Sequence, residues 1–384
     1  MTTSFQKKTR SKVLQIPGAK PSIYNNQLLI STGIPSLDHI LGGGVAVGTI
    51  LLIEEDTYGN YARLMLKYFC AEAVMTGHSL LLASADADPE QILKELPAPI
   101  IDDPGKGEAT LEEPSHDSSS DNMKIAWRYR HLPKFQSNTS GVKFGHYYDL
   151  SKTMESELTQ TVDISTVDSS LCACDSKQTD GEFNNPGYNS LLKTIQEKIM
   201  ANGFSTTTQV EKRNILRLAL HSIGSPMWGE KGGLTENEMY SPALPRFLVG
   251  LKAILRTAYA CCVITVPAHL FCDKAYVRRL ERLTDTVVEV DSFVGSDKEK
   301  NPVYKDYHGL FNIKQLPCLN SLVCNMPDSL DLAFKLRRKK LTIEKLHLPP
   351  DLSETANRSQ EDPLKNLKPS SGCGTGGRSN KLEF

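Results

Sequence analysis

The sequence lacks the cysteine spacing of a zinc site or a disulfide framework. Nine cysteines occur among 384 residues, and no two of them are spaced as Cys-x-x-Cys. Cys172 and Cys174 lie in a polar stretch, whereas Cys261 and Cys262 lie in an apolar run, where a thiol acts as a small hydrophobic group. These features argue against structural zinc and favour a reducing compartment, the cytosol or the nucleus.

Long hydrophobic runs are also missing. No stretch approaches the roughly 20 apolar residues that cross a bilayer, and no apolar signal segment follows the first methionine. We therefore expect no membrane partner. The formal net charge is −1, which excludes a globally basic surface but leaves room for local basic patches.

Charge and polar composition divide the chain into three parts. Residues 1–25 contain five basic residues and no acid, which predicts a disordered basic arm; an RNA-contacting tail or a nuclear address is the alternative. Residues 26–350 are predicted to form a single domain, and residues 351–384 a disordered C-terminal tail. Three polar stretches are interpreted as insertions into the domain: 102–122, 163–187 and 229–241.

Strand and helix patterns alternate within the predicted domain. A strand over 49–54 precedes an apolar helix over 61–75, and SLLLAS at 79–84 is a second strand without hydrophobic alternation. Later strands are expected at 214–221, 260–266, 286–291 and 309–316, with helices at 188–200, 244–259 and 275–283. This order implies an α/β fold with a mainly parallel central sheet and helices on both faces.

A phosphate-binding loop is expected between the strand at 49–54 and the helix that follows it. A working P-loop reads Gly-x-x-x-x-Gly-Lys-Ser/Thr, where the lysine reaches the phosphates and the hydroxyl holds Mg²⁺. Here Glu55 stands where the first glycine of the motif belongs. Asn60, which follows Gly59, stands where the second glycine belongs. Tyr61 replaces the lysine and Ala62 the hydroxyl residue. The P-loop is therefore degenerate, although weak nucleotide binding through the helix N-terminus is an alternative.

The sequence before this loop, STGIPSLDHILGGGVAVG at 31–48, resembles the RecA-like ATPases of the circadian-clock and archaeal recombinase branch. The resemblance implies a RecA-like fold. Within this segment, Ser36 or Asp38 is placed to cap a short helix that ends at Gly42.

Two further motifs of that branch are also altered. Asp86 and Ala87 stand where paired glutamates are usual. His221, followed by Ser222, stands where a strand should end in an aspartate that orients Mg²⁺, an ion that prefers oxygen ligands. We interpret His221 as a partly buried strand-end histidine rather than a catalytic group. No catalytic or metal-binding residue is expected.

Longer segments resemble a more specific family. They occur in the order KIAWRYRHLPKF (124–135), FGHYYDLSK (144–152), RNILRLALHSIGSPMW (213–228), VDSFVGS (290–296), NPVYKDYHGLFNIKQLP (301–317) and LAFKLRRKKLTIEKLHLPPDLS (332–353). Together they resemble the PAXNEB family, the fourth subunits of the Elongator complex, over about residues 22–353.

The resemblance implies a non-catalytic subunit with defined partners. Family members form a hetero-hexameric RecA-like ring with the fifth and sixth Elongator subunits, and this ring attaches to the catalytic core subunits and binds tRNA. The whole complex modifies the wobble uridine (U34), giving 5-carboxymethyl-type and 5-carbamoylmethyl-type uridines, in the cytoplasm and nucleus. No cofactor is expected in this chain alone; ATP at an interface shared with a ring neighbour is the alternative.

One basic and aromatic segment is a candidate for RNA contact. Its cations are Lys124, Arg128, Arg130 and Lys134, interleaved with aromatic residues, as on many RNA-binding surfaces. The alternative is that its aromatic residues pack in the core or at a subunit interface. A second basic cluster at 335–340 is interpreted as a solvated helix face or a nucleic-acid contact.

Three functions remain in competition on these grounds. The first is the RNA-binding ring subunit, the second an active RecA-like ATPase, and the third a partner-docking adaptor without RNA contact. The altered P-loop argues against the second.

Overall fold

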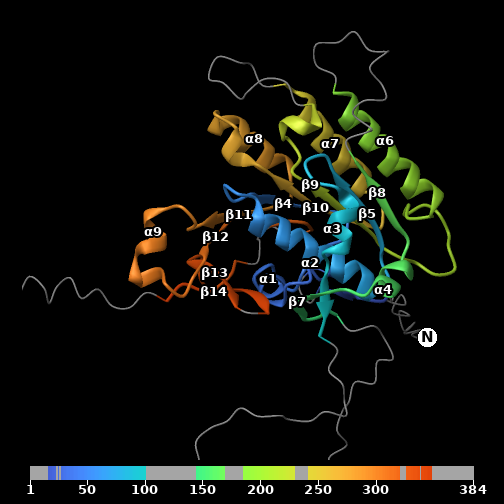
Figure 1. The fold of residues 1–384 in the computed structure, drawn as a ribbon. Helices are drawn as coiled ribbons and strands as arrows, with labels where there is room; N and C mark the ends of the chain where they lie inside the picture. The colour runs from blue at the N-terminus through green and yellow to red at the C-terminus, as the bar shows by residue number, and fades with distance from the viewer. Residues whose placement is uncertain are drawn as a thin grey trace, which may run out of the picture. The chain divides into compact units, whose positions relative to one another are not determined.

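A nine-stranded sheet runs through the centre of the protein (Figure 1). The computed structural model describes residues 16–22, 25, 27–100, 144–168, 185–229, 241–320, 326–337 and 339–347. Across the sheet the strands follow the order β14 (Lys340–Lys345), β13 (Leu332–Arg337), β12 (Gly309–Gln315), β11 (Thr286–Ser292), β4 (Ile50–Glu54), β10 (Ala260–Val266), β9 (Leu216–His221), β5 (Ser79–Ser84) and β8 (Ile164–Val167). The strands from β11 to β8 are parallel, and β12, β13 and β14 extend the sheet by antiparallel pairing.

Both faces of the parallel strands are buried, which explains their unbroken apolar sequences. In β4, Leu51 and Ile53 belong to one hydrophobic core, and Ile50 and Leu52 belong to a second. Helices α1 (Pro35–Ile40), α2 (Asn60–Thr76) and α3 (Pro89–Lys94) complete the first core. The second is completed by α6 (Pro186–Ala201), α7 (Ala243–Leu255) and α8 (Lys274–Leu283), which lie together on the other side of the sheet in Figure 1. The predicted α/β fold is confirmed, and its mostly parallel central sheet is consistent with a RecA-like fold.

Shorter elements lie beside the central sheet. Strands β1 (Ala19–Pro21), β2 (Leu28–Ile30) and β3 (Val45–Ala46) form a small antiparallel sheet, and β6 (Pro97–Pro99) pairs with β7 (Tyr148–Thr153). The short helices are α4 (Ser156–Gln160), η1 (Pro226–Trp228), η2 (Ala268–Leu270), α9 (Asp297–Lys300) and η3 (Pro302–Tyr304).

Order begins earlier than a disordered arm over 1–25 would allow. Ile16 is 3% exposed and belongs to the first core, and β1 pairs with β2. The insertion expected over 163–187 is likewise too long, because β8 pairs with β5 and α6 begins at Pro186. The stretch 102–122, the residues 169–184 and 230–240 and the tail 351–384 lie outside the described residues.

The basic cluster at 335–340 lies on a β-hairpin, so the interpretation as a helix face is wrong. Strands β13 and β14 are antiparallel, with Arg337 opposite Lys340. Their apolar residues alternate along each strand, and Phe334 and Ile343 are buried in the first core. A period of two is the pattern of a strand with one buried face.

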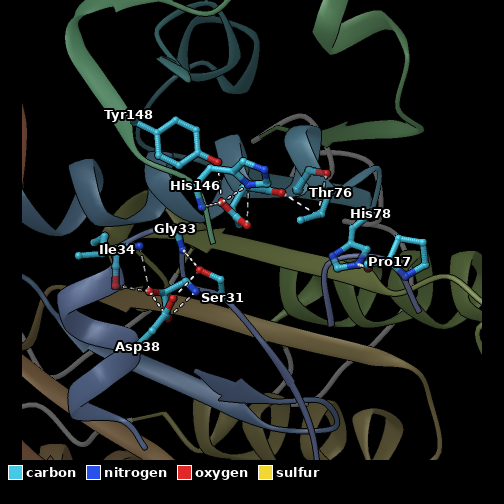
Figure 2. Close-up of polar contacts among 12 residues, drawn as sticks. Pro17, Ser31, Gly33, Ile34, Asp38, Thr76, His78, His146 and Tyr148 are labelled. Atoms are coloured by element: carbon cyan, nitrogen blue, oxygen red, sulfur yellow. Dashed lines mark hydrogen bonds and ion pairs between the residues drawn. The ribbon is translucent and has the colours of Figure 1, made fainter. Parts of the chain in front are cut away.

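The segment at 31–48 builds a buried polar turn rather than a helix cap. The carboxylate of Asp38 accepts hydrogen bonds from Ser31 Oγ (2.5 Å) and from the backbone N–H and hydroxyl of Thr32 (2.8 Å each), as Figure 2 shows around Asp38. Asp38 lies inside α1, whose N-cap Ile34 makes no side-chain hydrogen bond. Ser36 instead accepts a bond from the N–H of Ile343. Neither predicted cap is therefore correct; the motif joins α1 to the strand before it and to β14.

A second buried network surrounds Glu72 of α2, which is fully inaccessible to solvent. Its carboxylate accepts bonds from the Tyr148 hydroxyl (2.6 Å) and the His146 N–H (3.2 Å), two residues that lie together in Figure 2. Close by, the buried guanidinium of Arg217 donates to the carbonyl of Ser31 (2.7 Å) and to His78 Nδ1 (3.0 Å). Burial, aided by Arg217, lowers the pKa of His78 to about 3, so this imidazole is neutral. The bonds of Glu72 fasten α2 to β7, and those of Arg217 fasten β9 to the segment before α1 and to His78, just after α2.

Candidate functional site

The P-loop position lies at the centre of the sheet. Strand β4 runs between β10 and β11 and ends at Glu54, and α2 begins five residues after Glu55 at Asn60. In open parallel sheets, ligands bind at the carboxyl ends of the strands, where loops lead into helices. The loop over 55–59 is therefore the place where a nucleotide phosphate would be held.

The N-terminus of α2 is already occupied by a carboxylate of the chain itself. Asp56 Oδ2 accepts from the N–H of Asn60 (3.2 Å), and Oδ1 accepts from the N–H groups of Tyr61 (3.1 Å) and Ala62 (3.2 Å). These are the backbone donors that a helix N-terminus offers to an anion. Asp56 is 3% exposed, so its buried carboxylate leaves none of these three donors to another anion.

The loop reaches this geometry through Gly59, the N-cap residue of α2. Its φ of 64° lies in the left-handed region that glycine tolerates best. The chain thereby folds back so that Asp56, which lies ahead of the helix in sequence, faces the first turn. The sequence interpretation counted Asp56 only as unfavourable charge and missed its capping role.

Tyr61 and Ala62 have packing roles where a P-loop has lysine and serine or threonine. The Tyr61 ring lies 4.6 Å from the ring of Phe334 in β13 and 6.4 Å from that of His308, centroid to centroid. Ala62 is fully buried in the first core. Tyr61 therefore links α2 to the antiparallel extension of the sheet, and Ala62 leaves no hydroxyl for a metal ion.

Glu55, which is partly buried, occupies the wall of a small pocket of about 230 Å³. The pocket is also lined by Gly59, Asn60, Asp86, His221 and Ser222. The structure thus brings the loop residues predicted for the site together with both altered motifs. Tyr61 and Ala62 are absent from this lining because they face the core.

Acid and neutral groups dominate this pocket. Burial raises the pKa of Glu55 to about 7, with Asp86 and Asp56 adding to the effect, although the hydroxyls of Thr265 and Ser222 oppose it. Ser222 donates to Glu55 Oε2 at 3.3 Å. Arg63 also lines the pocket, but its Nη2 lies 3.5 Å from Glu95 Oε2. A polyanion would meet carboxylates here rather than the lysine of a P-loop.

His221 at the end of β9 is a buried, hydrogen-bonded histidine. It is 6% exposed, its Nδ1 lies 3.0 Å from Ser84 Oγ, and its carbonyl accepts from the indole of Trp228 (3.2 Å). Burial, with Arg63 nearby, lowers the pKa of His221 to about 4, so the ring is neutral at pH 7. Within the described residues, no group of three or more histidine, cysteine, aspartate or glutamate side chains is arranged to hold a metal ion.

The RNA-contact candidates Lys124, Arg128, Arg130 and Lys134 lie outside the described residues. The prediction made for them therefore stays a prediction. In the described ranges no helix is both long and apolar enough to cross a membrane.

Fold and site together define an α/β protein with a mostly parallel central sheet, consistent with a RecA-like fold, in which the chain's own Asp56 carboxylate caps the first turn of α2. Comparison with known proteins is more specific. The model of the PAXNEB protein family matches residues 12–384, and the chain belongs to that family.

Several relatives are similar along nearly their whole length. The protein named Elongator complex protein 4 of Danio rerio is 48% identical over 385 residues, covering 99% of this chain and 95% of the relative. Those with the same name from Xenopus laevis and Homo sapiens are 48% and 45% identical, covering 100% of this chain and 95% and 94% of the relatives. The family resemblance drawn from the sequence motifs is confirmed.

Proposed function

We propose that this chain is a non-catalytic subunit of the Elongator complex. It assembles with the fifth and sixth subunits into a hetero-hexameric RecA-like ring that attaches to the catalytic core subunits. The ring binds tRNA and supports modification of the wobble uridine (U34) to 5-carboxymethyl-type and 5-carbamoylmethyl-type products, in the cytoplasm and nucleus. Support for Elongator membership comes from the family and from the names of the relatives.

One observation carries the non-catalytic part of the proposal. The Asp56 carboxylate takes the three N–H groups of Asn60, Tyr61 and Ala62 that a nucleotide phosphate would need. A phosphate that displaced it would leave the buried carboxylate without its hydrogen-bond donors. The carboxylate would also repel the phosphate beside it, so both effects oppose binding. This argues against an independent ATP site in the loop; ATP at an interface shared with a ring neighbour would have to use other groups.

Assembly is tested by co-expressing the full-length chain with the fifth and sixth subunits of the same organism. We expect co-purification at equal stoichiometry, with a mass by light scattering that corresponds to two copies of each. A stable monomer that recovers neither partner would overturn the ring.

RNA binding is tested on that assembled ring. Charge reversal of Arg128, Arg130 and Lys134 should weaken tRNA binding, and reversal of Lys193, an exposed lysine of α6 paired with Glu197, serves as the control. Unchanged tRNA affinity in the triple variant would clear this segment of the role and favour the adaptor without RNA contact.

Catalysis is tested on the isolated chain. We expect no steady hydrolysis of Mg-ATP. Hydrolysis that disappears when Tyr61 or His221 is replaced would restore the active ATPase as the better function.

A further inference from the structure

A larger acidic pocket lies beside the P-loop position. Its volume is about 490 Å³, and it lies where β4 and β11 end, next to α8. Six of its lining residues are acids: Glu54, Glu55, Asp56, Glu281, Glu289 and Asp291. A cavity of this size is within the range of small-ligand pockets, so one extended side chain can enter it.

One of the two lysines that line the pocket, Lys314, is shared by three of these acids. Lys314 Nζ lies 2.7 Å from Glu54 Oε2, 3.3 Å from Glu281 Oε1 and 3.4 Å from Glu289 Oε1. Three carboxylates against one ammonium leave two negative charges unbalanced when all are ionised. Lys274 and Arg278 also line the pocket, but both are exposed to solvent and so stand at its edge.

Glu54 has an oxygen that no donor reaches. Its side chain is 4% exposed, and its buried Oε1 has no hydrogen-bond partner in the part of the chain that the structure describes. Buried carboxylate oxygens are normally hydrogen-bonded, so an unmet one favours a donor supplied from outside the chain. Burial, reinforced by Glu281 and opposed by Lys314, raises the pKa of Glu54 to about 7. A second cation would satisfy the oxygen and stabilise the ionised carboxylate.

Exposed apolar side chains stand beside the pocket. Tyr58 is 60% exposed, Leu270 37% and Val294 48%. Tyr58 and Leu270 each adjoin a lining residue in sequence, and the Tyr58 hydroxyl lies against Gly295, next to Val294. Apolar groups around a charged pocket are typical of a surface that another protein covers. The carboxylates themselves repel the phosphates of RNA, which leaves a protein as the favoured partner.

We propose that this acidic pocket binds an arginine or lysine side chain of a neighbouring protein subunit, whose cationic head pairs with Glu54, Glu281 and Glu289 while its flanking residues cover Tyr58, Leu270 and Val294. Arginine fits better than lysine, because its planar guanidinium donates to two carboxylates at once and is more weakly hydrated. The inference rests on the proposed membership of a ring. It assigns a role in subunit contact to the end of the sheet where β4 and β11 stop.

The test uses the full-length chain and the purified fifth and sixth subunits. Glu54→Gln, Glu281→Gln and Glu289→Gln keep the shape of each side chain and remove its charge. Glu197→Gln, on the exposed face of α6, is the matched control, since its side chain is 67% exposed and outside the pocket. Association is measured by titration calorimetry, and folding by circular dichroism and thermal unfolding.

We expect each pocket variant to bind its partner at least about tenfold more weakly, as for the loss of one partner of a buried charge pair, with the control unchanged. If Glu54→Gln folds poorly, Glu289→Gln carries the test, because that side chain is 35% exposed. A photoreactive p-benzoylphenylalanine at Thr57, an exposed lining residue, should cross-link to a partner peptide that contains the cation. Replacing the cross-linked arginine or lysine of the partner by glutamate should weaken its complex with the wild-type chain. Glu281→Arg in this chain should then partly restore binding.

The outcomes separate this inference from the proposed function. Tight assembly of the wild type and of all three variants overturns the inference and leaves the ring intact. Failure of the wild type to assemble overturns both. Variants that assemble normally but lose binding of spermidine would assign the pocket to a small polyamine. Variants that assemble normally but gain binding of tRNA would assign the pocket to charge repulsion of RNA. Either result would overturn the protein partner.

Discussion

Replacing Asp56 by alanine should destabilise the protein and open an anion site at the start of α2. The change removes the acceptor of three backbone N–H groups inside a nearly inaccessible turn. Loss of a helix cap costs about 0.5–2 kcal/mol, and hydrogen bonds to a charged acceptor contribute about 1.5–3 kcal/mol each, though not additively. Relief of the repulsion between Asp56 and Glu55 offsets a part. We expect a net loss of about 2–3 kcal/mol.

Thermal and urea unfolding of the full-length chain measure this loss. For a domain of this size it corresponds to a melting temperature lower by about 4–8 °C. Asp88→Ala is the matched control. Asp88 caps the short helix α3 through a single exposed bond to the N–H of Glu90 (3.0 Å), so its removal should cost about 1 kcal/mol or less. Asp56→Asn keeps one acceptor oxygen and should fall between the two.

The second part of the prediction concerns inorganic phosphate. In the wild type the three N–H groups donate to Asp56, so about 20–50 mM phosphate should raise the melting temperature little. In Asp56→Ala the same groups face an open turn, and phosphate should stabilise the variant more than the wild type. Equal stabilisation of both proteins, or an unchanged stability of Asp56→Ala without phosphate, would refute the assignment of Asp56 as the internal anion.

Tyr61→Ala should cost about 1–3 kcal/mol in urea unfolding, because it removes the contact with Phe334, whereas Tyr58→Ala, 60% exposed, should change stability little. Tyr148→Phe should cost about 1–3 kcal/mol by removing the donor to buried Glu72, whereas Tyr147→Phe, 51% exposed, should be nearly neutral. The pKa of Glu55 is raised from 4.5 to about 7 in the folded protein, so the contribution of Glu55 to stability is fullest below pH 4.5 and is lost as the pH rises through 7. Glu55→Gln should reduce the total loss of stability over this pH range by at most about 3 kcal/mol, and a pH dependence identical to that of the wild type would contradict the burial of its charge.

The sequence predicts the sheet well where both faces of a strand are buried. The runs at 79–84 and 260–266 contain too few polar residues to be anything but buried, and both are interior strands with a neighbour on each side. Strand β8 was missed because only Val167 of its four residues is buried, so its composition matches the polar stretch around it. The hairpin β13–β14 was missed for another reason: the basic residues at 335–340 interrupt the apolar alternation of Leu332, Phe334 and Leu336.

The candidate site shows a different limit. The absence of the P-loop lysine and hydroxyl is legible in the sequence, because it requires only an alignment of positions. The role of Asp56 is not, since it depends on the left-handed conformation of Gly59 and on which N–H groups then lie within reach. The role of Tyr61 depends likewise on Phe334, which is distant in sequence and is brought close only by the antiparallel extension of the sheet.

The residues at the proposed P-loop position have structural roles of their own. Asp56 caps α2, Tyr61 packs against β13, Ala62 fills the core, and His221 holds Ser84. Restoring lysine at Tyr61 alone would remove an aromatic contact and place an ammonium against Phe334, while Asp56 would still occupy the N–H groups. Restoring a hydroxyl at Ala62 alone would put a polar atom into a fully buried position. We therefore expect that either of these two substitutions alone costs stability without providing a nucleotide site, and that nucleotide binding requires at least Asp56 and Tyr61 to be replaced together.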